Sequence, residues 1–203
     1  MADKKGSIYY RDIRSFDFDR AFNFLNNQGL SNKGEPKNTK IIALDDDGDD
    51  YEINYDQVKE KAYTEDIFNI KLWLYFRWRI ILTFRKEHGC FILEFHLFSL
   101  LHKEIDIVSK IFVSFFINEI SVNKKSLLGM FIDRYGETYE YDFTPVFTTN
   151  SEKVDYITDL ICLPKEKFGL VEIEPGFSMK ELDNGFICAS RYPEFLNYLM
   201  SSS

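Results

Sequence analysis

Between residues 70 and 97, apolar side chains recur at every second position over long stretches of the chain. Residues 78–85 and 90–97 show this most clearly, with polar or charged side chains at many of the positions between. His88 and Gly89 separate the two runs. A period of two is typical of half-buried β-strands, so the pattern predicts a meander of antiparallel strands around residues 70–97.

Three segments repeat apolar residues with helical spacing, which predicts helices near 17–28, 103–120 and 193–200. Ser15 or Asp17 can cap the first helix, and Pro193 suits the first turn of the last. Weaker patterns predict a helix at 57–68, a polar loop at 31–38, and strands at 8–13, 40–44, 51–55, 127–134, 139–149, 170–173 and 186–189. Residues 154–163 fit either a helix or a strand.

This order of elements predicts an α+β fold with a mainly antiparallel sheet. No internal repeat or long biased linker divides the chain, so we expect residues 1–203 to form a single globular domain. Phenylalanine occurs 20 times and 45% of residues are hydrophobic, which favours a sheet-rich, aromatic core. We expect one core to contain Trp73, Leu82, Phe84, Phe91, Leu93, Phe95, Phe112 and Phe115.

The formal net charge of −8 argues against a general nucleic-acid-binding protein, which needs a basic stripe. Arg77, Arg79 and Arg85 lie near Trp73 and Trp78 and could form a platform for stacked bases. They equally fit the solvated rim of a strand, so we expect no nucleic-acid partner.

We expect a cytoplasmic protein that has no membrane partner. The N-terminus lacks the apolar stretch of a signal peptide. No apolar run approaches the roughly 18 to 20 residues that a spanning helix needs. Cys90, Cys162 and Cys188 are odd in number and show no metal-binding spacing, so reduced, buried thiols are expected.

Histidine and carboxylate residues offer one candidate site for chemistry. Glu94 and His96 share a strand face, and His102 and Asp106 follow them. Such groups can bind zinc or iron, but the spacing lacks the H-E-x-x-H pattern that places ligands on one helical face. We therefore predict no metal and no cofactor, and we keep an enzyme with a site around Glu94, His96 and His102 as an alternative.

The segment from Asp45 to Glu52 holds six carboxylates around an Asp-Gly pair, which predicts an acidic hairpin turn. A calcium loop is a weaker interpretation. If Gly48 stood at the sixth position of an EF-hand loop, Ala43 and Asn54 would occupy the first and last ligand positions, and neither supplies a carboxylate.

Tyrosines accompany the carboxylates here and at 139–141, and that composition is typical of protein-binding surfaces. The alternative is that acidic loops only keep an aromatic-rich protein in solution. The predicted contact residues are Asp46, Asp47, Asp49, Asp50, Tyr51, Glu52, Tyr139, Glu140 and Tyr141.

In size, acidity, aromatic content and lack of catalytic motifs, the chain resembles the small α+β immunity proteins that protect bacteria from toxins. That resemblance, which rests on no family motif, implies a non-enzymatic cytoplasmic protein that covers the basic site of a toxin domain with an acidic, tyrosine-containing surface. A structural subunit of a larger assembly is a further alternative.

Overall fold

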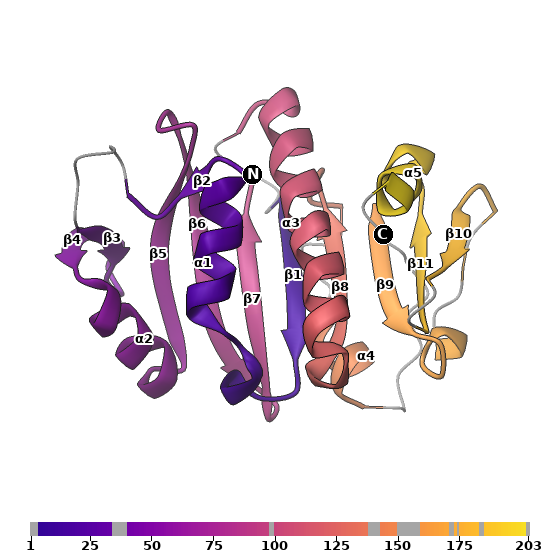
Figure 1. Cartoon of the computed structure of the whole chain (residues 1–203), viewed down its shortest axis with the longest axis horizontal. Helices are drawn as coiled ribbons and strands as arrows, with labels where there is room; N and C mark the ends of the chain where they lie inside the picture. Colours follow the sequence, from indigo (N-terminus) through magenta and orange to yellow (C-terminus); the bar gives the residue numbers. More distant parts are fainter. Residues whose placement is uncertain are drawn as a thin grey trace.

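The computed structural model describes residues 4–33, 40–97, 100–137, 143–149, 159–170, 173, 175–182 and 185–201. Its described strands form one open antiparallel sheet in the order β10-β11-β9-β8-β1-β7-β6-β5-β3-β4, and β2 pairs with β5 beside β3 (Figure 1). The predicted α+β class with a mainly antiparallel sheet is confirmed. The strands are β1 Lys5–Tyr10, β2 Leu30–Ser31, β3 Ile41–Leu44, β4 Asp50–Ile53, β5 Ile67–Leu74, β6 Trp78–Glu87, β7 Cys90–His96, β8 Leu127–Asp133, β9 Leu160–Pro164, β10 Ser178–Glu181 and β11 Phe186–Ser190.

Side-chain caps begin the first two helices. Asp17 accepts a hydrogen bond from the backbone of Arg20 and starts the first helix, and Asn54 and Gln57 form a capping box at the second. The helices are α1 Phe18–Asn27, α2 Tyr55–Thr64, α3 His102–Asn123, α4 Thr144–Thr148 and α5 Pro193–Ser201. The predictions near 17–28, 103–120 and 193–200 correspond to α1, α3 and α5.

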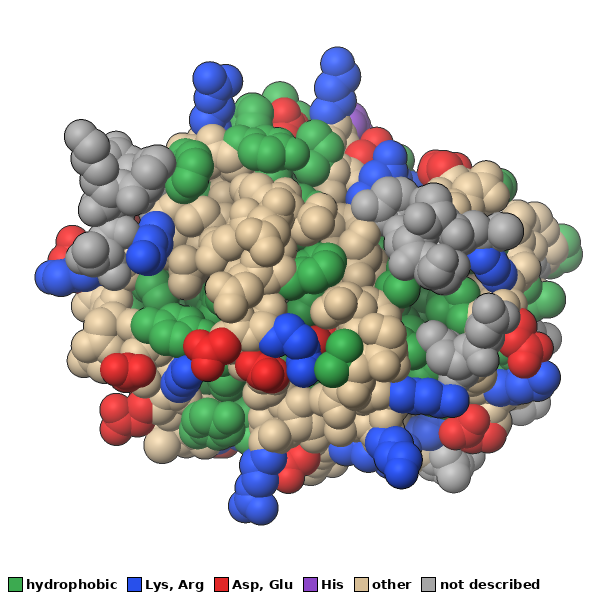
Figure 2. All heavy atoms as spheres, viewed as in Figure 1, with side chains coloured by type: hydrophobic (Ala, Val, Ile, Leu, Met, Phe, Trp, Pro, Cys, Tyr) green, Lys and Arg blue, Asp and Glu red, His purple; other side chains and the backbone are tan. Residues whose placement is uncertain are grey.

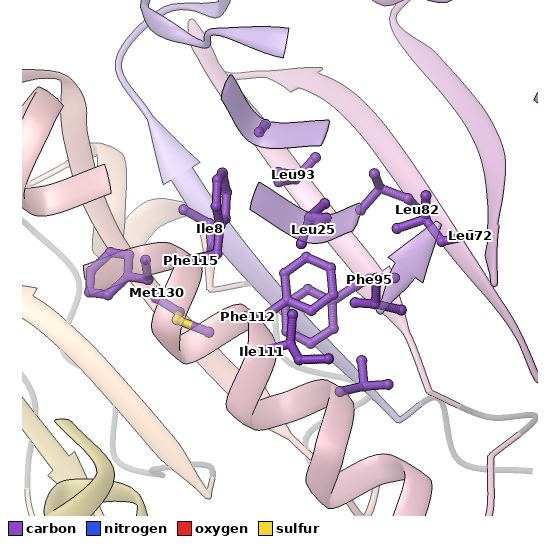
Figure 3. Close-up of a cluster of buried hydrophobic side chains, with 14 of the residues drawn as sticks. Ile8, Leu25, Leu72, Leu82, Leu93, Phe95, Ile111, Phe112, Phe115 and Met130 are labelled. Carbon is purple, nitrogen blue, oxygen red and sulfur yellow. The ribbon is translucent and has the colours of Figure 1, made fainter. Parts of the chain in front are cut away.

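Helices α1, α3 and α5 lie in front of the sheet in the view of Figure 1. The apolar side chains beneath them form the main core. Phe95 of β7 stacks on Phe112 of α3 at a ring-centroid distance of 3.7 Å, at the centre of this core (Figure 3). All the predicted core residues except Trp73 belong to it. Trp73 is half-buried, because alternation along β5 turns it to the opposite side of the sheet together with Lys71.

The opposite side of the sheet is divided into an apolar part and a polar part. Over β1, β8 and β9, the short helix α4 contributes Val146 and Phe147 to a second apolar cluster, and Phe147 stacks on Tyr9 at 4.0 Å. Over β5, β6 and β7, the same side carries Asn69, Thr83 and Glu94 instead. We call this second part the polar face.

Several predicted elements were wrong in type or extent. Residues 144–148, expected as part of a strand at 139–149, form α4, because Pro145 begins a helix without loss of a hydrogen bond. Of the strand expected at 170–173, Leu170 ends a 3-10 helix and Ile173 is not in a strand, while 171–172 lie outside the described residues. The helix at 57–68 stops at Thr64, and β2 and β10 were missed. Within the ambiguous segment 154–163, residues from Leu160 onward are in β9.

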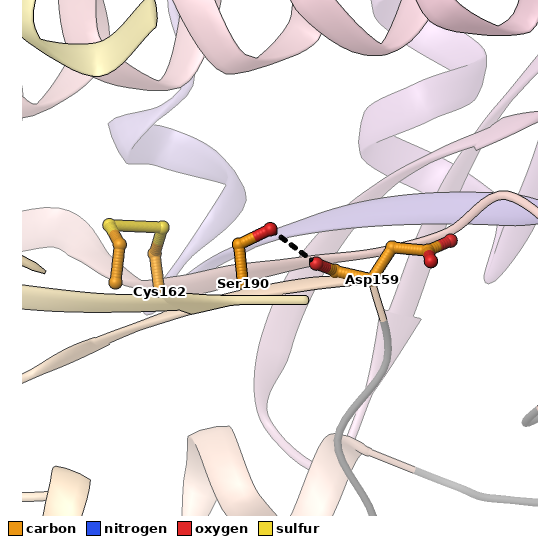
Figure 4. Close-up of a disulfide and its surroundings, with 4 residues drawn as sticks. Asp159, Cys162 and Ser190 are labelled. Carbon is orange, nitrogen blue, oxygen red and sulfur yellow. Dashed lines mark hydrogen bonds between the residues drawn. A yellow bond between two sulfur atoms is a disulfide. The ribbon is translucent and has the colours of Figure 1, made fainter. Parts of the chain in front are cut away.

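The expectation of three reduced thiols was also wrong. Cys162 of β9 and Cys188 of β11 are direct partners in the sheet register and form a disulfide, while Cys90 is a buried cysteine outside any disulfide. Figure 4 shows the bond, with the hydroxyl of Ser190 nearby donating to the backbone carbonyl of Asp159 at 2.6 Å. The disulfide links two strands whose pairing the sequence could not reveal.

Among the described residues, no helix is both long enough and apolar enough to cross a membrane.

Candidate functional site

The predicted acidic turn connects β3 to β4, the last strand in the described sheet order. The side chain of Asp45 shapes it by accepting hydrogen bonds from the backbone N–H groups of Asp47 at 3.1 Å and Asp49 at 2.8 Å. Gly48 adopts a left-handed backbone with φ of 83°, which glycine tolerates best. The turn is therefore well matched to its sequence and presents a fixed shape.

The carboxylates of this segment have different surroundings. Asp50 pairs with the ammonium of Lys71, and Glu52 pairs with Lys40 at 2.6 Å. Asp46, Asp47 and Asp49 are exposed and have no cationic partner in the part of the chain that the structure describes. We call these three residues the acidic tip, because they carry the charge that remains available to a partner.

Of the predicted tyrosine contacts, Tyr51 lies within the described residues. Tyr51 is half-buried and packs against the main core, and its ring centre lies 5.8 Å from the ammonium of Lys61. Tyr139, Glu140 and Tyr141 lie outside the described residues.

Two cavities flank the acidic turn. One, of about 590 Å³, lies toward α2 and includes Tyr51, Lys61 and Glu65 in its lining. The other, of about 400 Å³, lies between the turn and the polar face, where Asn69, Ile81 and His96 meet Asp46 and its neighbours. The fold thus brings the acidic turn and His96, one residue of the predicted histidine site, to the same cavity.

Hydrogen bonds connect the side chains of the polar face across four strands. Thr83 donates to the side-chain carbonyl of Asn69 at 2.6 Å, and its Oγ1 lies 3.1 Å from His96 Nε2. His96 Nε2 is 3.3 Å from Glu94 Oε1, and Ser7 donates to Glu94 Oε2 at 3.2 Å. These contacts join residues of β1, β5, β6 and β7 into one network.

Glu94 is the buried charge at the centre of this network. Burial alone would raise the pKa of its carboxyl, but the hydrogen bond with His96 and the charges of Lys5 and Arg85 outweigh burial and lower the pKa to about 2. The ammonium of Lys5 lies 3.7 Å from Glu94 Oε2, and Arg85 lies at 3.5 Å. The carboxylate is therefore ionised and charge-compensated, which is a stabilising arrangement.

Among the described residues, Thr83, His96 and Glu94 do not form a hydroxyl–histidine–carboxylate triad. A triad needs the carboxylate at one imidazole nitrogen and the hydroxyl at the other, so that a proton can pass through the ring. Here Nε2 of His96 faces both Glu94 and Thr83. Within the described residues, no group of three or more His, Cys, Asp or Glu side chains is arranged to hold a metal ion.

His102 and Asp106 belong to a different environment from Glu94 and His96. His102 begins α3 beside the ring of Tyr135, and Asp106 accepts a hydrogen bond from Arg134 at 2.6 Å. Of the residues grouped in the enzyme hypothesis, the fold brings Glu94 and His96 together and places His102 elsewhere.

Arg134 anchors a second charged cluster that the sequence did not suggest. Its buried guanidinium lies 4.1 Å from the ring centre of Tyr192 and 4.6 Å from that of Phe195. Asp159 accepts the backbone N–H of Arg134 at 2.6 Å. Burial raises the pKa of Asp159 to about 6, even though the Arg134 contacts oppose that rise. The cluster connects α3, α5, β8 and β9. The sequence did not predict it, because a single arginine after a strand forms no recognisable pattern.

No protein-family model, no curated protein and no solved structure matches this chain.

Proposed function

We propose that the protein is a non-enzymatic binding protein that neutralises a basic protein partner, in the manner of an immunity protein acting on a toxin domain. The observation that carries the proposal is the acidic tip: three exposed carboxylates without cationic partners among the described residues, on a turn with a fixed shape at the edge of the sheet. The partner surface it fits is cationic.

Electrostatics would act mainly on the rate of encounter. Exposed charges of one sign attract a basic surface over about one Debye length, roughly 8 to 10 Å at physiological salt. That attraction speeds association more than it slows dissociation. The cavities on either side of the turn offer room for side chains of the partner once it has docked.

The proposal places the protein in the cytoplasm of a bacterial cell. Cytosolic thiols are normally kept reduced, whereas Cys162 and Cys188 form a disulfide in the structure. Mass spectrometry after thiol alkylation of protein from host cells tests this part of the proposal. Modified Cys162 and Cys188 support a reducing compartment, and an intact disulfide argues for export.

The binding proposal is tested by capture from host extract with three matched baits: the wild type, a variant of the acidic tip, and a control with the same loss of charge. The tip variant is Asp46→Asn, Asp47→Asn, Asp49→Asn. The control is Glu60→Gln, Glu166→Gln, Glu194→Gln, at exposed positions on other elements. A basic protein that the wild type and the control retain and the tip variant loses supports the proposal. Equal retention by all three baits contradicts it.

An enzyme remains the second candidate, because His96 and Glu94 lie beside a cavity. Turnover of any substrate that disappears with His96→Ala, in protein whose thermal unfolding is unchanged, would favour this candidate over binding. A structural subunit is a third candidate, and recovery of the native protein only within a stable, stoichiometric assembly would favour it.

A further inference from the structure

The turn between β5 and β6 has a backbone that its sequence does not favour. Tyr75 and Phe76 have φ values of 48° and 60°, and the backbone N–H of Arg77 donates to the carbonyl of Leu74 at 3.0 Å. Left-handed backbone at both central positions is the mark of a type I′ turn, in which Asn-Gly is strongly preferred. Two bulky aromatic residues therefore occupy positions where they add strain.

The strained turn is held in place by Gly29, the residue before β2. The backbone N–H of Tyr75 donates to the carbonyl of Gly29 at 2.9 Å. The ring of Tyr75 lies so close to Gly29 that a Cβ there would come within 2.4 Å of it. Tyr75 therefore has a structural role as a lid on Gly29. Among the described residues, no comparable contact is found for Phe76, so the strain at Phe76 calls for another explanation.

Both rings are exposed to solvent at one end of the sheet. Tyr75 is 52% exposed and Phe76 46%, and Arg77 beside them is exposed. Figure 1 places the start of α3 at the same end, where Leu101 is 71% exposed and Lys103 is exposed. In Figure 2, hydrophobic side chains gather along this upper end, and Lys or Arg side chains project from it. We call Tyr75, Phe76, Arg77, Leu101 and Lys103 the aromatic end.

We propose that the aromatic end docks on the surface of an anionic lipid bilayer. Aromatic rings are favoured at the boundary between lipid headgroups and acyl chains, and leucine contributes apolar area there. Arginine and lysine beside them are attracted to lipid phosphates and to the negative surface potential. A shallow, peripheral contact of this kind needs no spanning helix, and it replaces the expectation from the sequence that the protein has no membrane partner. It is also independent of the acidic tip, which lies on another turn.

The structure favours lipid over nucleic acid as the occupant. Nucleic-acid binding without a sequence preference needs a basic groove that follows the backbone over several phosphates. The aromatic end offers two exposed cations, Arg77 and Lys103, in a chain with a net charge of −8. The rings also stand at the apex of a turn, where they can enter a soft interface end-on.

The test uses the full chain and phosphatidylcholine vesicles with or without phosphatidylglycerol. Both tryptophans, Trp73 and Trp78, flank the turn, so their quenching by brominated lipid reports contact at this end. Binding is expected with phosphatidylglycerol and is expected to weaken as salt is added. Phe76→Gly should lower the partition coefficient about tenfold through lost apolar burial. Arg77→Gln should lower it about fivefold.

The matched control is Ile67→Thr. Ile67 is 56% exposed at the opposite end of the same strand, so this variant should bind vesicles like the wild type. Phe76→Gly should unfold at the same temperature as the wild type or higher, so weaker binding cannot be attributed to a damaged fold. No binding to anionic vesicles, or equal loss for Phe76→Gly and Ile67→Thr, would overturn the proposal. So would binding to a single-stranded oligonucleotide, but not to vesicles, that Phe76→Gly abolishes.

Discussion

Two hairpin turns of the same sheet differ in how well sequence and backbone agree. The turn after β3 has glycine at its left-handed position and an aspartate that accepts two backbone N–H groups. The turn after β5 has tyrosine and phenylalanine at left-handed positions instead. The backbone of the first turn is therefore unstrained, whereas the backbone of the second turn is strained.

This difference helps to distinguish surface residues that serve folding from surface residues that serve binding. At the acidic turn, folding and solubility alone could account for Asp45 and Gly48, so only the exposed charges of the acidic tip point to a partner. At Phe76 of the aromatic end, folding would be better served by another residue, and the strain itself points to a role outside the fold.

The largest expected effect concerns Glu94, the buried carboxylate of the polar face. Because the pKa of Glu94 is lowered from 4.5 to about 2, its ionised form stabilises the folded state above pH 4.5. This contribution, about 3 kcal/mol, is lost as the pH falls from 4.5 toward 2. Urea unfolding of the wild type and Glu94→Gln across this range should show a steeper loss for the wild type. Parallel curves would contradict a charge-compensated Glu94.

The next effect distinguishes the carboxylates within β4. Asp50→Asn should cost about 2 kcal/mol, because it leaves the ammonium of Lys71, whose side chain is only 10% exposed, without its partner. Glu52→Gln removes a pair in which both side chains are more than half exposed and should cost under about 0.5 kcal/mol. Chemical denaturation of both variants measures the difference. Equal costs would mean that Asp50 belongs with the acidic tip.

Opposite changes in the two turns should have opposite effects on stability. Gly48→Ala should cost about 1 kcal/mol from backbone strain alone, since a Cβ at Gly48 meets nothing within 4 Å. Phe76→Gly should instead stabilise by up to about 1 kcal/mol. Calorimetry should place the two unfolding temperatures on either side of the wild type. A lower unfolding temperature for Phe76→Gly would show that Phe76 serves the fold after all.

The smallest expected effect on stability is at the acidic tip. Asp46→Asn, Asp47→Asn, Asp49→Asn should unfold within about 0.5 kcal/mol of the wild type, because exposed like charges contribute little to the fold. Thermal unfolding at low salt checks this. A clear loss would assign the three residues a structural role and weaken the binding proposal.

Regular patterns made the fold class predictable. Alternation at 78–97 and the Asp17 cap depend on neighbouring residues, so they were visible in the sequence. The helix at 144–148 was missed because it is too short for periodicity and its residues resemble a strand. The disulfide joins cysteines 26 residues apart through the register of β9 and β11, which no local pattern encodes.

The contacts of the candidate site also depend on strand pairing and could not be predicted from local patterns. The sequence located all six carboxylates of the acidic segment, but their neutralisation depends on lysines elsewhere, such as Lys71 on β5. The hydrogen bond between Ser7 and Glu94 spans 87 residues and arises only when β1 pairs with β7. Which charges are available to a partner is therefore a property of the sheet and could not be predicted from spacing.

The most direct test of the central claim is the association rate constant between this protein and its captured basic partner, measured by stopped-flow mixing over a range of salt concentrations. The account predicts a rate constant that falls as salt rises, and a slow rate with little salt dependence for Asp46→Asn, Asp47→Asn, Asp49→Asn. The control Glu60→Gln, Glu166→Gln, Glu194→Gln should remain close to the wild type. If the tip variant associates at the wild-type rate in low salt, the acidic tip does not steer the partner and the claim is wrong.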